Sequence, residues 1–290
     1  MKWRRAGKRD LSQLLAFLIP HEWRAVPYTS RLRRQGKTAF PTALAASVLV
    51  YKDGSDIRGT MMLTSAGLLL PVFTPARGQS QAVPPRPFPG WKDLALQLYS
   101  VMGPIDEVAW LEGVLPLRAG ASIDYHLMIQ NRDSFSNARR ESFPYPPGLV
   151  VRTAYPPDLA ALLPLQIRYE LEEVVITRGR YNEQACRQNL KRSLRQQLVL
   201  MAELNGKVVA KAGTNARGFT ADQIGGVFTV KDVRNNGIAF RVMEELLRRI
   251  FAQKPTVCLF VKKTNLPALS LYGKLGFRIA DGYRISYFKA

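Results

Sequence analysis

VRNNGIAFRVMEELLRRIF, residues 233–251, is the stretch that decides how the second half of the chain is interpreted. A short turn containing Gly237 runs directly into a long amphipathic segment, with apolar residues at helical spacing from Ile238 onward. The first amides of a helix have no partner within the helix, and the helix dipole makes that end positive. A glycine in such a turn lets an anionic group approach the backbone closely. The sequence therefore predicts a phosphate-binding turn at the start of a helix.

This turn does not follow the two best-known phosphate-binding patterns. It lacks the Gly-x-x-x-x-Gly-Lys-Ser/Thr of a P-loop, and it has one glycine where the dinucleotide fingerprint requires three. The strand-like segment GGVFTV, residues 225–230, comes just before it. The turn therefore joins a strand to a helix, but it predicts neither P-loop nucleotide hydrolysis nor a dinucleotide site.

A second motif follows at a suitable distance. Residues 259–277, LFVKKTNLPALSLYGKLGF, combine a strand with a short helix. Taken together with the turn, this segment resembles the GNAT (GCN5-related N-acetyltransferase) superfamily. The turn at residues 234–239 matches Arg/Gln-x-x-Gly-x-Gly/Ala, and the second segment matches Asn-x-x-Ala-x-x-Leu-Tyr-x-x-x-Gly-Phe. The matching residues of the second segment are Asn265, Ala268, Leu271, Tyr272, Gly276 and Phe277.

The resemblance covers about residues 148–290 and implies a mixed α/β sheet, splayed and flanked by helices. Acetyl-CoA would bind as co-substrate where the strand ending at Val230 parts from the strand ending at Val261. Amides of the turn would hold the pyrophosphate, and the preceding strand would bind the pantetheine arm through its main chain. The implied cofactor-binding residues are Phe228, Val230, Arg234, Asn235, Asn236, Gly237, Ile238, Ala239 and Asn265.

The same resemblance implies direct attack of an amine on the thioester, with Tyr272 as the acid for the departing thiolate. The general base is missing from its usual place, because the strand at residues 223–230 carries no carboxylate. Glu172 and Glu173, at the end of a predicted helix, are the first candidates in its stead, and Glu203 or a water relay from backbone carbonyls is the alternative. Their alternative interpretation is a solvated helix end, and that of Tyr272 is an aromatic ring packed on the sheet.

Proline and glycine near residue 147 predict a boundary between an N-terminal unit, residues 1–147, and the GNAT domain, residues 148–290. In the second unit, Asn205–Gly206 predicts a hairpin, and residues 278–288 predict a final pair of strands. In the first unit, residues 91–102 predict a helix and the proline-rich residues 76–90 a loop. Its order of elements resembles a degenerate GNAT copy, as in bacterial tandem GNAT proteins, with no turn like that at 234–239.

The composition is that of a globular protein, with 47% hydrophobic and 22% charged residues in a chain of 290. The net charge of +20 favours anionic partners. It is spread over both halves, however, so a nucleic-acid partner is possible but not favoured. Two cysteines and two histidines without ligand spacing predict neither disulfides nor a metal site. The two cysteines without a disulfide framework fit a reducing compartment, so we expect a cytoplasmic protein. No segment is long and apolar enough for a membrane span.

Three functions remain open at this point. The first is an acyl-CoA-dependent N-acyltransferase acting on a small-molecule or protein amine. The second is an aminoacyl-tRNA-dependent transferase, which tandem GNAT domains and positive charge also suit. The third is a CoA- or ligand-sensing protein without turnover, suggested by the missing strand carboxylate. The acceptor, the acyl chain and the oligomeric state do not follow from the sequence.

Overall fold

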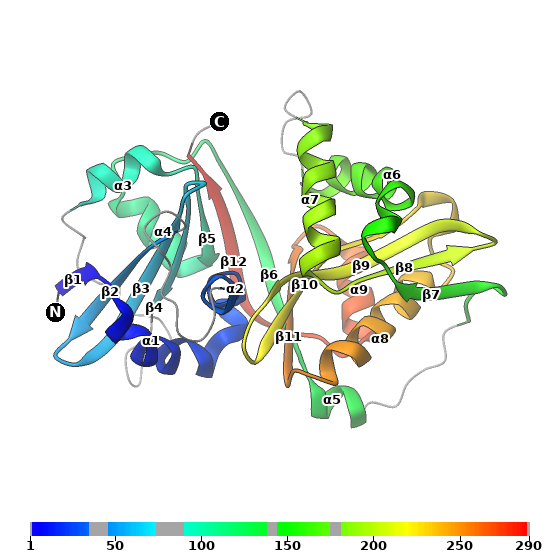
Figure 1. Ribbon diagram of the computed structural model, residues 1–290, viewed down its shortest axis with the longest axis horizontal. Helices are drawn as coiled ribbons and strands as arrows, with labels where there is room; N and C mark the ends of the chain where they lie inside the picture. The colour runs from blue at the N-terminus through cyan, green and yellow to red at the C-terminus, as the bar shows by residue number, and fades with distance from the viewer. Residues whose placement is uncertain (1, 35–45, 74–89, 138–143, 175–180, 289–290) are drawn as a thin grey trace.

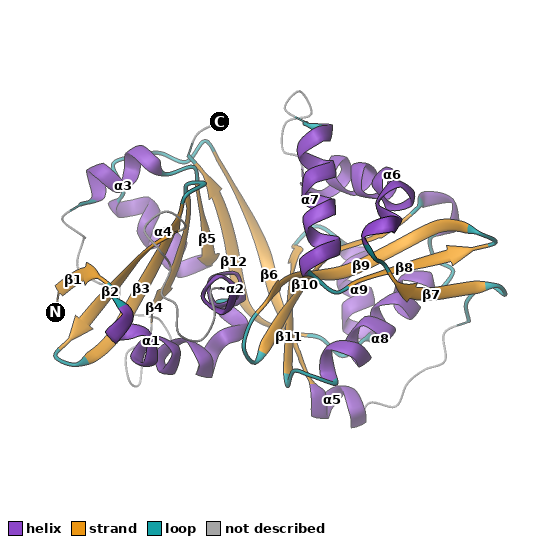
Figure 2. Cartoon of the chain, in the orientation of Figure 1, coloured by secondary structure: helices purple, strands orange, loops and turns teal. Residues whose placement is uncertain are grey.

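A computed structural model describes residues 2–34, 46–73, 90–137, 144–174 and 181–288 (Figure 1). The described residues form one mixed sheet of twelve strands with helices on both faces (Figure 2). The strands are β1 Lys2–Arg5, β2 Ala46–Asp53, β3 Asp56–Thr64, β4 Leu68–Phe73, β5 Ser100–Pro104, β6 Ala121–Asn131, β7 Leu149–Thr153, β8 Val199–Leu204, β9 Lys207–Arg217, β10 Ala221–Thr229, β11 Thr256–Lys262 and β12 Arg278–Tyr287. Their order across the sheet is β1-β2-β3-β4-β5-β12-β6-β11-β10-β9-β8-β7.

The helices cover the two halves of this sheet. They are α1 Leu11–Leu18, α2 Val26–Arg34, α3 Trp91–Gln97, α4 Ile105–Val114, α5 Arg132–Asn137, α6 Leu159–Tyr169, α7 Glu183–Gln196, α8 Ile238–Phe251 and α9 Leu266–Lys274. The short helical turns are η1 Lys8–Asp10, η2 Ile19–Arg24, η3 Pro156–Asp158, η4 Glu170–Val174 and η6 Lys231–Val233. The mixed α/β fold predicted from the sequence is confirmed. The proline-rich loop at 76–90 falls almost wholly outside the described residues.

The two halves exchange strands. β6 lies between β11 and β12, and it pairs with β11 at seven positions from Thr256–Asn131 to Lys262–Tyr125. β12 lies between β5 and β6 and is antiparallel to both. The strand pair predicted for residues 278–288 is wrong, because Arg278–Tyr287 forms one continuous strand with a bulge near Ile279. The hydrogen bonds offered by a neighbour on each side favour an extended strand over a local hairpin.

Alternating side chains of the second half pack on opposite faces of the sheet, as the strand period of two requires. Val199 and Met201 of β8 face α6 and α7, where Leu162 and Leu190 meet them. Residues on the other face meet the apolar stripe of α8, whose buried members are Ile238, Val242, Met243, Leu246, Leu247, Ile250 and Phe251. Each such side chain stabilises the fold by about 1.5–3 kcal/mol through burial. This packing fixes the first residue of α8 against the end of β10.

The hairpin between β8 and β9 is confirmed at Asn205–Gly206. Both residues have positive φ, 50° and 76°. That conformation suits a two-residue turn between antiparallel strands, and asparagine and glycine adopt it at little cost. The turn sets the register of β9, and through β9 that of β10.

In the first half, β4 and β5 are parallel and pair at Leu68–Ser100 and Leu69–Val101. Beyond these positions side chains of the N-terminal unit occupy the space between β4 and β5. Pro71 lies so close to Gly103 that a Cβ there would be 3.0 Å from the proline ring. The N-terminal unit therefore has side chains at the place where the second half has an opening.

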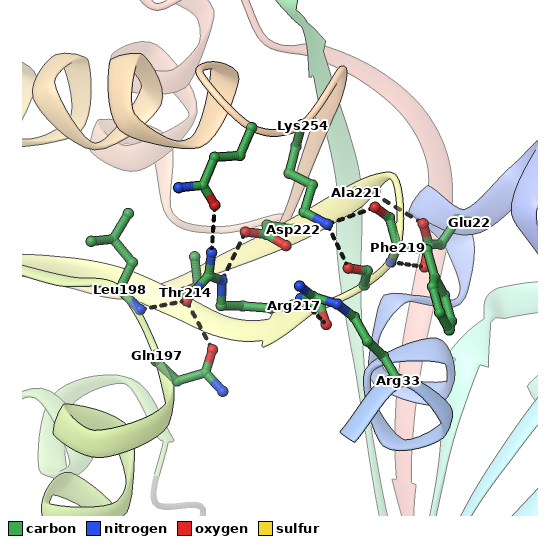
Figure 3. A network of polar contacts seen from close by, with 12 residues as sticks. Glu22, Arg33, Gln197, Leu198, Thr214, Arg217, Phe219, Ala221, Asp222 and Lys254 are labelled. Carbon is green, nitrogen blue, oxygen red and sulfur yellow. Dashed lines mark hydrogen bonds and ion pairs between the residues drawn. The ribbon is translucent and has the colours of Figure 1, made fainter. Parts of the chain in front are cut away.

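A buried carboxylate holds the two halves together (Figure 3). Glu22, in η2, is 1% exposed and lies against the turn between β9 and β10. Its carboxylate accepts hydrogen bonds from the amides of Phe219, Thr220 and Ala221 at 2.7, 2.6 and 3.0 Å, and from the Thr220 hydroxyl at 2.6 Å. Lys254 Nζ donates to the carbonyl of Phe219 at 2.6 Å. The same turn is thus bound through its amides and its carbonyls.

Candidate functional site

The sheet opens between β10 and β11. These parallel strands are paired from Ala221–Thr256 to Ile224–Leu259 and then diverge. At the same place β10 bulges away from its other neighbour, with irregular register between Gly225 and Phe228. Between the diverging strands lies a cavity of about 860 Å³. The predicted splay is therefore present, and the backbone edges of both strands line it.

The turn before α8 forms one end of the cavity. Asn235 and Gly237 both have positive φ, 65° and 70°, and α8 begins at Ile238. Glycine is required at 237 for a second reason, since a Cβ there would overlap the carbonyl oxygen of Pro144. The helix therefore starts abruptly, and its first amides lie beside the opening.

Most of the residues predicted for cofactor binding line this cavity. They are Phe228, Arg234, Asn235, Gly237, Ile238, Ala239 and Asn265. Val230 and Asn236 were also predicted and are not among the lining residues. Asn265 has a local partner as well, because its Oδ1 accepts from the Ala268 amide at 3.1 Å and so caps α9.

The two candidate bases lie on η4, which crosses the mouth of the cavity. Glu172 forms an ion pair with Arg234 at 2.9 Å and a longer one with Lys231 at 3.9 Å. Glu173 pairs with Lys262 of β11 at 3.5 Å and accepts from Asn265 Nδ2 at 3.3 Å. Glu173 lines the cavity, whereas Glu172 does not. The two carboxylates thus connect η4 to opposite sides of the opening.

Tyr272 projects from α9 into the same cavity. It is 7% exposed, and its ring is tilted against Phe277 at a centroid distance of 5.8 Å. Burial raises the pKa of the Tyr272 phenol, and the nearby Tyr169 and Glu173 add to that increase. The phenol therefore keeps its proton at neutral pH, as a proton donor must.

Comparison with known proteins agrees with this geometry. Residues 165–277 match the model of the acetyltransferase (GNAT) family. This part of the chain is a GNAT domain. It contains the splayed strands, the turn before α8 and Tyr272. No curated protein sequence is significantly similar to the chain.

Solved structures extend the likeness to both halves. A tandem GNAT protein from the clavulanic acid biosynthesis pathway has 13% identity and a TM-score of 0.58, with 98% of this chain and 97% of that one covered. A Drosophila protein reaches a TM-score of 0.67 at 12% identity, with 98% of each chain covered. A GCN5-related N-acetyltransferase from Sphaerobacter thermophilus has 18% identity and a TM-score of 0.56, with 98% and 94% covered. The tandem fold is thus shared along the whole chain.

The GNAT domain also receives residues that sequence reasoning missed. Tyr125, from β6 of the first half, lines the cavity together with Tyr169 and Tyr287. Burial raises the pKa of Tyr125 and of Tyr169 to about 12, so both phenols stay protonated. Tyr125 stands beside Lys262 on β11 and Tyr283 on β12. No local signal points to it, because its place depends on the exchange of strands.

Within the described ranges, no group of three or more His, Cys, Asp or Glu could hold a metal ion. In the same ranges, no helix is long and apolar enough to cross a membrane. Cys186 and Cys258 are both buried and free.

Proposed function

We propose that the protein is an acyl-CoA-dependent N-acyltransferase that moves an acetyl group from acetyl-CoA to a primary amine. The observation that carries the proposal is one cavity that joins two features, the N-terminus of α8 and the parted edges of β10 and β11. A diphosphate suits the positive helix end, and an extended arm with amide groups suits an open strand edge. Acetyl-CoA carries both, and it supplies an activated thioester.

The residues present fit this ligand. The cavity volume lies within the range of small-molecule sites. Arg234 adds positive charge beside the turn, and its side chain is held by the Thr229 carbonyl at 2.9 Å. Lys262 and Lys274 also line the cavity. These cations and the amides at residues 235–239 would hold the phosphates of the cofactor, and Phe228 would flank its arm.

The chain's own groups can serve each proton transfer. As the amine nitrogen attacks the thioester carbon, a C–N bond forms, and the C–S bond then breaks with its electron pair on sulfur. Tyr272 would give its proton to that sulfur. Glu173, or a water that it orients, would accept the proton released by the amine. Glu172 would serve indirectly, by holding Arg234 at the mouth.

The acceptor would enter beside the aromatic wall formed by Tyr125, Tyr169 and Tyr287. Aromatic faces attract a cationic amine and its apolar body, and Glu173 is the carboxylate in reach of the same space. A small-molecule amine and an exposed amine of a protein both remain compatible with this wall. The N-terminal unit would then shape acceptor choice through β6.

A second candidate function is ligand sensing without turnover. It is favoured by one observation. Glu172 and Glu173 are both engaged in ion pairs, and residues 223–230, along the opening, carry no carboxylate in their place. A protein of this kind would bind acetyl-CoA and transfer nothing to any amine.

The test uses one position at the start of α8. Ala239→Asp puts a negative charge in the first helical turn, which helps the helix itself but repels phosphate. Ala239→Asn is the matched neutral control, because its side chain has nearly the same shape. Calorimetric titration with acetyl-CoA should show at least tenfold weaker binding to Ala239→Asp, about 1.4 kcal/mol. The Asn variant should bind about as well as the wild type.

Transfer is measured next, over a panel of amines, with Tyr272→Phe as the catalytic variant. Retained binding with lost transfer in Tyr272→Phe would support the acid role. Binding without transfer to any amine by the wild type would favour the sensing function. Absence of binding by the wild type would overturn both, and titration with RNA at several salt concentrations would then examine the tRNA-dependent alternative.

A further inference from the structure

Behind the bulge of β10 lies a buried ammonium group that the mechanism above does not use. Lys211 is on β9 and is 5% exposed. Its Nζ donates to the carbonyl oxygen of Gly226 at 2.8 Å and lies 4.6 Å from the centre of the Tyr169 ring. The group therefore touches Gly226, which lines the cavity, whereas Lys211 itself is not among the lining residues.

The surroundings of Lys211 come from three further elements. Tyr169 ends α6, Glu170 begins η4, and Cys186 lies on α7. Of these, Glu170 is the acidic group that favours the charged lysine, and it is itself held by Gln166 Nε2 at 2.9 Å. Burial works against the charge and lowers the pKa of Lys211 to about 8. An ammonium in such a place destabilises the fold relative to an apolar side chain of the same size.

The Lys211 ammonium fixes the orientation of one peptide group, the one between Gly226 and Val227. Gly226 has a φ of 64°, within the irregular part of β10 between Gly225 and Phe228. Here the ladder to β9 does not fix the peptide planes, so Lys211 fixes the Gly226 carbonyl instead. In a trans peptide the N–H points opposite to the C=O. The N–H of Val227 is therefore directed away from Lys211, and Val227 lines the cavity.

This orientation matters for the chemistry proposed above. When the amine attacks, the thioester carbonyl oxygen takes up an electron pair, and it returns the pair when the C–S bond breaks. An N–H group fixed in advance near that oxygen stabilises the developing charge. A cation bound to the carbonyl of the same peptide polarises it and makes its N–H a stronger donor.

We infer that Lys211 is a positioning residue of the acyltransferase: by holding the Gly226 carbonyl it aims the Val227 N–H at the thioester oxygen. The inference rests on the proposed function. It assigns Lys211 no contact with substrate, so its loss should act on the reacting carbonyl and leave the CoA moiety bound.

The experiment compares wild type, Lys211→Met and Lys211→Arg. Methionine fills similar space without a charge or a donor, and arginine keeps both. Each protein is titrated with CoA and with acetyl-CoA by calorimetry. The carbonyl stretch of bound acetyl-CoA, labelled with ¹³C at the thioester carbon, is then measured by infrared difference spectroscopy. Transfer to the best amine from the panel gives kcat and KM.

In the wild type we expect the bound carbonyl to absorb at lower frequency than the free one. Lys211→Met should lose most of that shift and roughly tenfold or more in kcat, with CoA affinity and the KM for acetyl-CoA nearly unchanged. In the wild type the shift should also fade as pH rises through about 8, where the ammonium loses its proton. Lys211→Arg should keep the shift at the higher pH.

Two outcomes separate this inference from the function on which it rests. A wild type that neither binds acetyl-CoA nor transfers acetyl overturns the proposed function itself. A wild type that does both, beside a Lys211→Met variant with the same carbonyl frequency and the same kcat, overturns the inference alone. The wild-type pH series needs no variant to fold, so a frequency that is constant from pH 7 to 9.5 also counts against it.

Discussion

Glu22→Gln probes the contact that joins the two halves. One oxygen of the Glu22 carboxylate accepts three hydrogen bonds, two from the amides of Thr220 and Ala221 and one from the Thr220 hydroxyl, while the other accepts from the Phe219 amide. A glutamine can keep the first set through its amide oxygen. Its NH₂ group then meets the Phe219 N–H, so one bond is lost and two donors face each other.

The cost follows from these contacts. A hydrogen bond to a charged group contributes about 1.5–3 kcal/mol, and a buried donor left without a partner costs a similar amount. We expect Glu22→Gln to lower the free energy of unfolding by roughly 2–3 kcal/mol. For a chain of this size that corresponds to about 5 °C in melting temperature. Urea unfolding followed by circular dichroism measures the change at constant temperature.

The control is Glu183→Gln. Glu183 is exposed in the first turn of α7, where loss of its charge should cost at most about 0.5 kcal/mol. Equal urea midpoints for Glu22→Gln and the wild type would refute the reasoning, since they would mean that the buried carboxylate contributes no more than a neutral amide.

Three further changes have calculable results. Because burial lowers the pKa of Lys211 from 10.5 to about 8, the unfolded chain holds more protons between these values and stability rises with pH. The unfolding free energy of the wild type minus that of Lys211→Met should increase by about 2 kcal/mol from pH 7 to 9.5, and a constant difference in urea titrations would contradict this. Gly276→Ala should lower the free energy of unfolding by roughly 2 kcal/mol, because φ is 84° and a Cβ would overlap the Gln130 amide. Gly273→Ala is the control, because Gly273 lies in an open helical position, and it should be neutral or stabilising. Thermal melting of both variants measures the difference. Tyr125→Ala should raise the KM for the amine several-fold and leave the calorimetric affinity for acetyl-CoA unchanged, whereas equal effects on both would place Tyr125 on the cofactor.

Local signals in the sequence were sufficient for two elements of the second half, the start of α8 and the hairpin between β8 and β9. Gly237 and the apolar spacing after it predicted the start of α8, and Asn205–Gly206 predicted the hairpin. Both depend on backbone conformations that few residues adopt, so a short stretch contains the information. The match at Asn265 and Tyr272 then placed α9 against the cavity.

Strand partners far apart in the sequence were not predictable in this way. Residues 91–102 were predicted as one helix, but α3 ends at Gln97 and β5 begins at Ser100, because pairing with β4 and β12 supplies hydrogen bonds that the helical pattern does not contain. Tyr125 was absent from every predicted site for the same reason. Its strand partners, Lys262 on β11 and Tyr283 on β12, are more than a hundred residues away in the sequence.

The exchange of β6 and β12 determines the order in which strands can pair while the chain is being synthesised. A ribosome releases β5 and β6 long before it makes β12, yet β12 is the strand that stands between them. Until then β5 and β6 each have an unpaired strand edge, which invites association with other chains. Pairings as distant as Ser100 with Tyr287 also make folding slow. Because Ile285 and Tyr287 of β12 line the cavity, its wall beside Tyr125 is complete only after β12 has been synthesised.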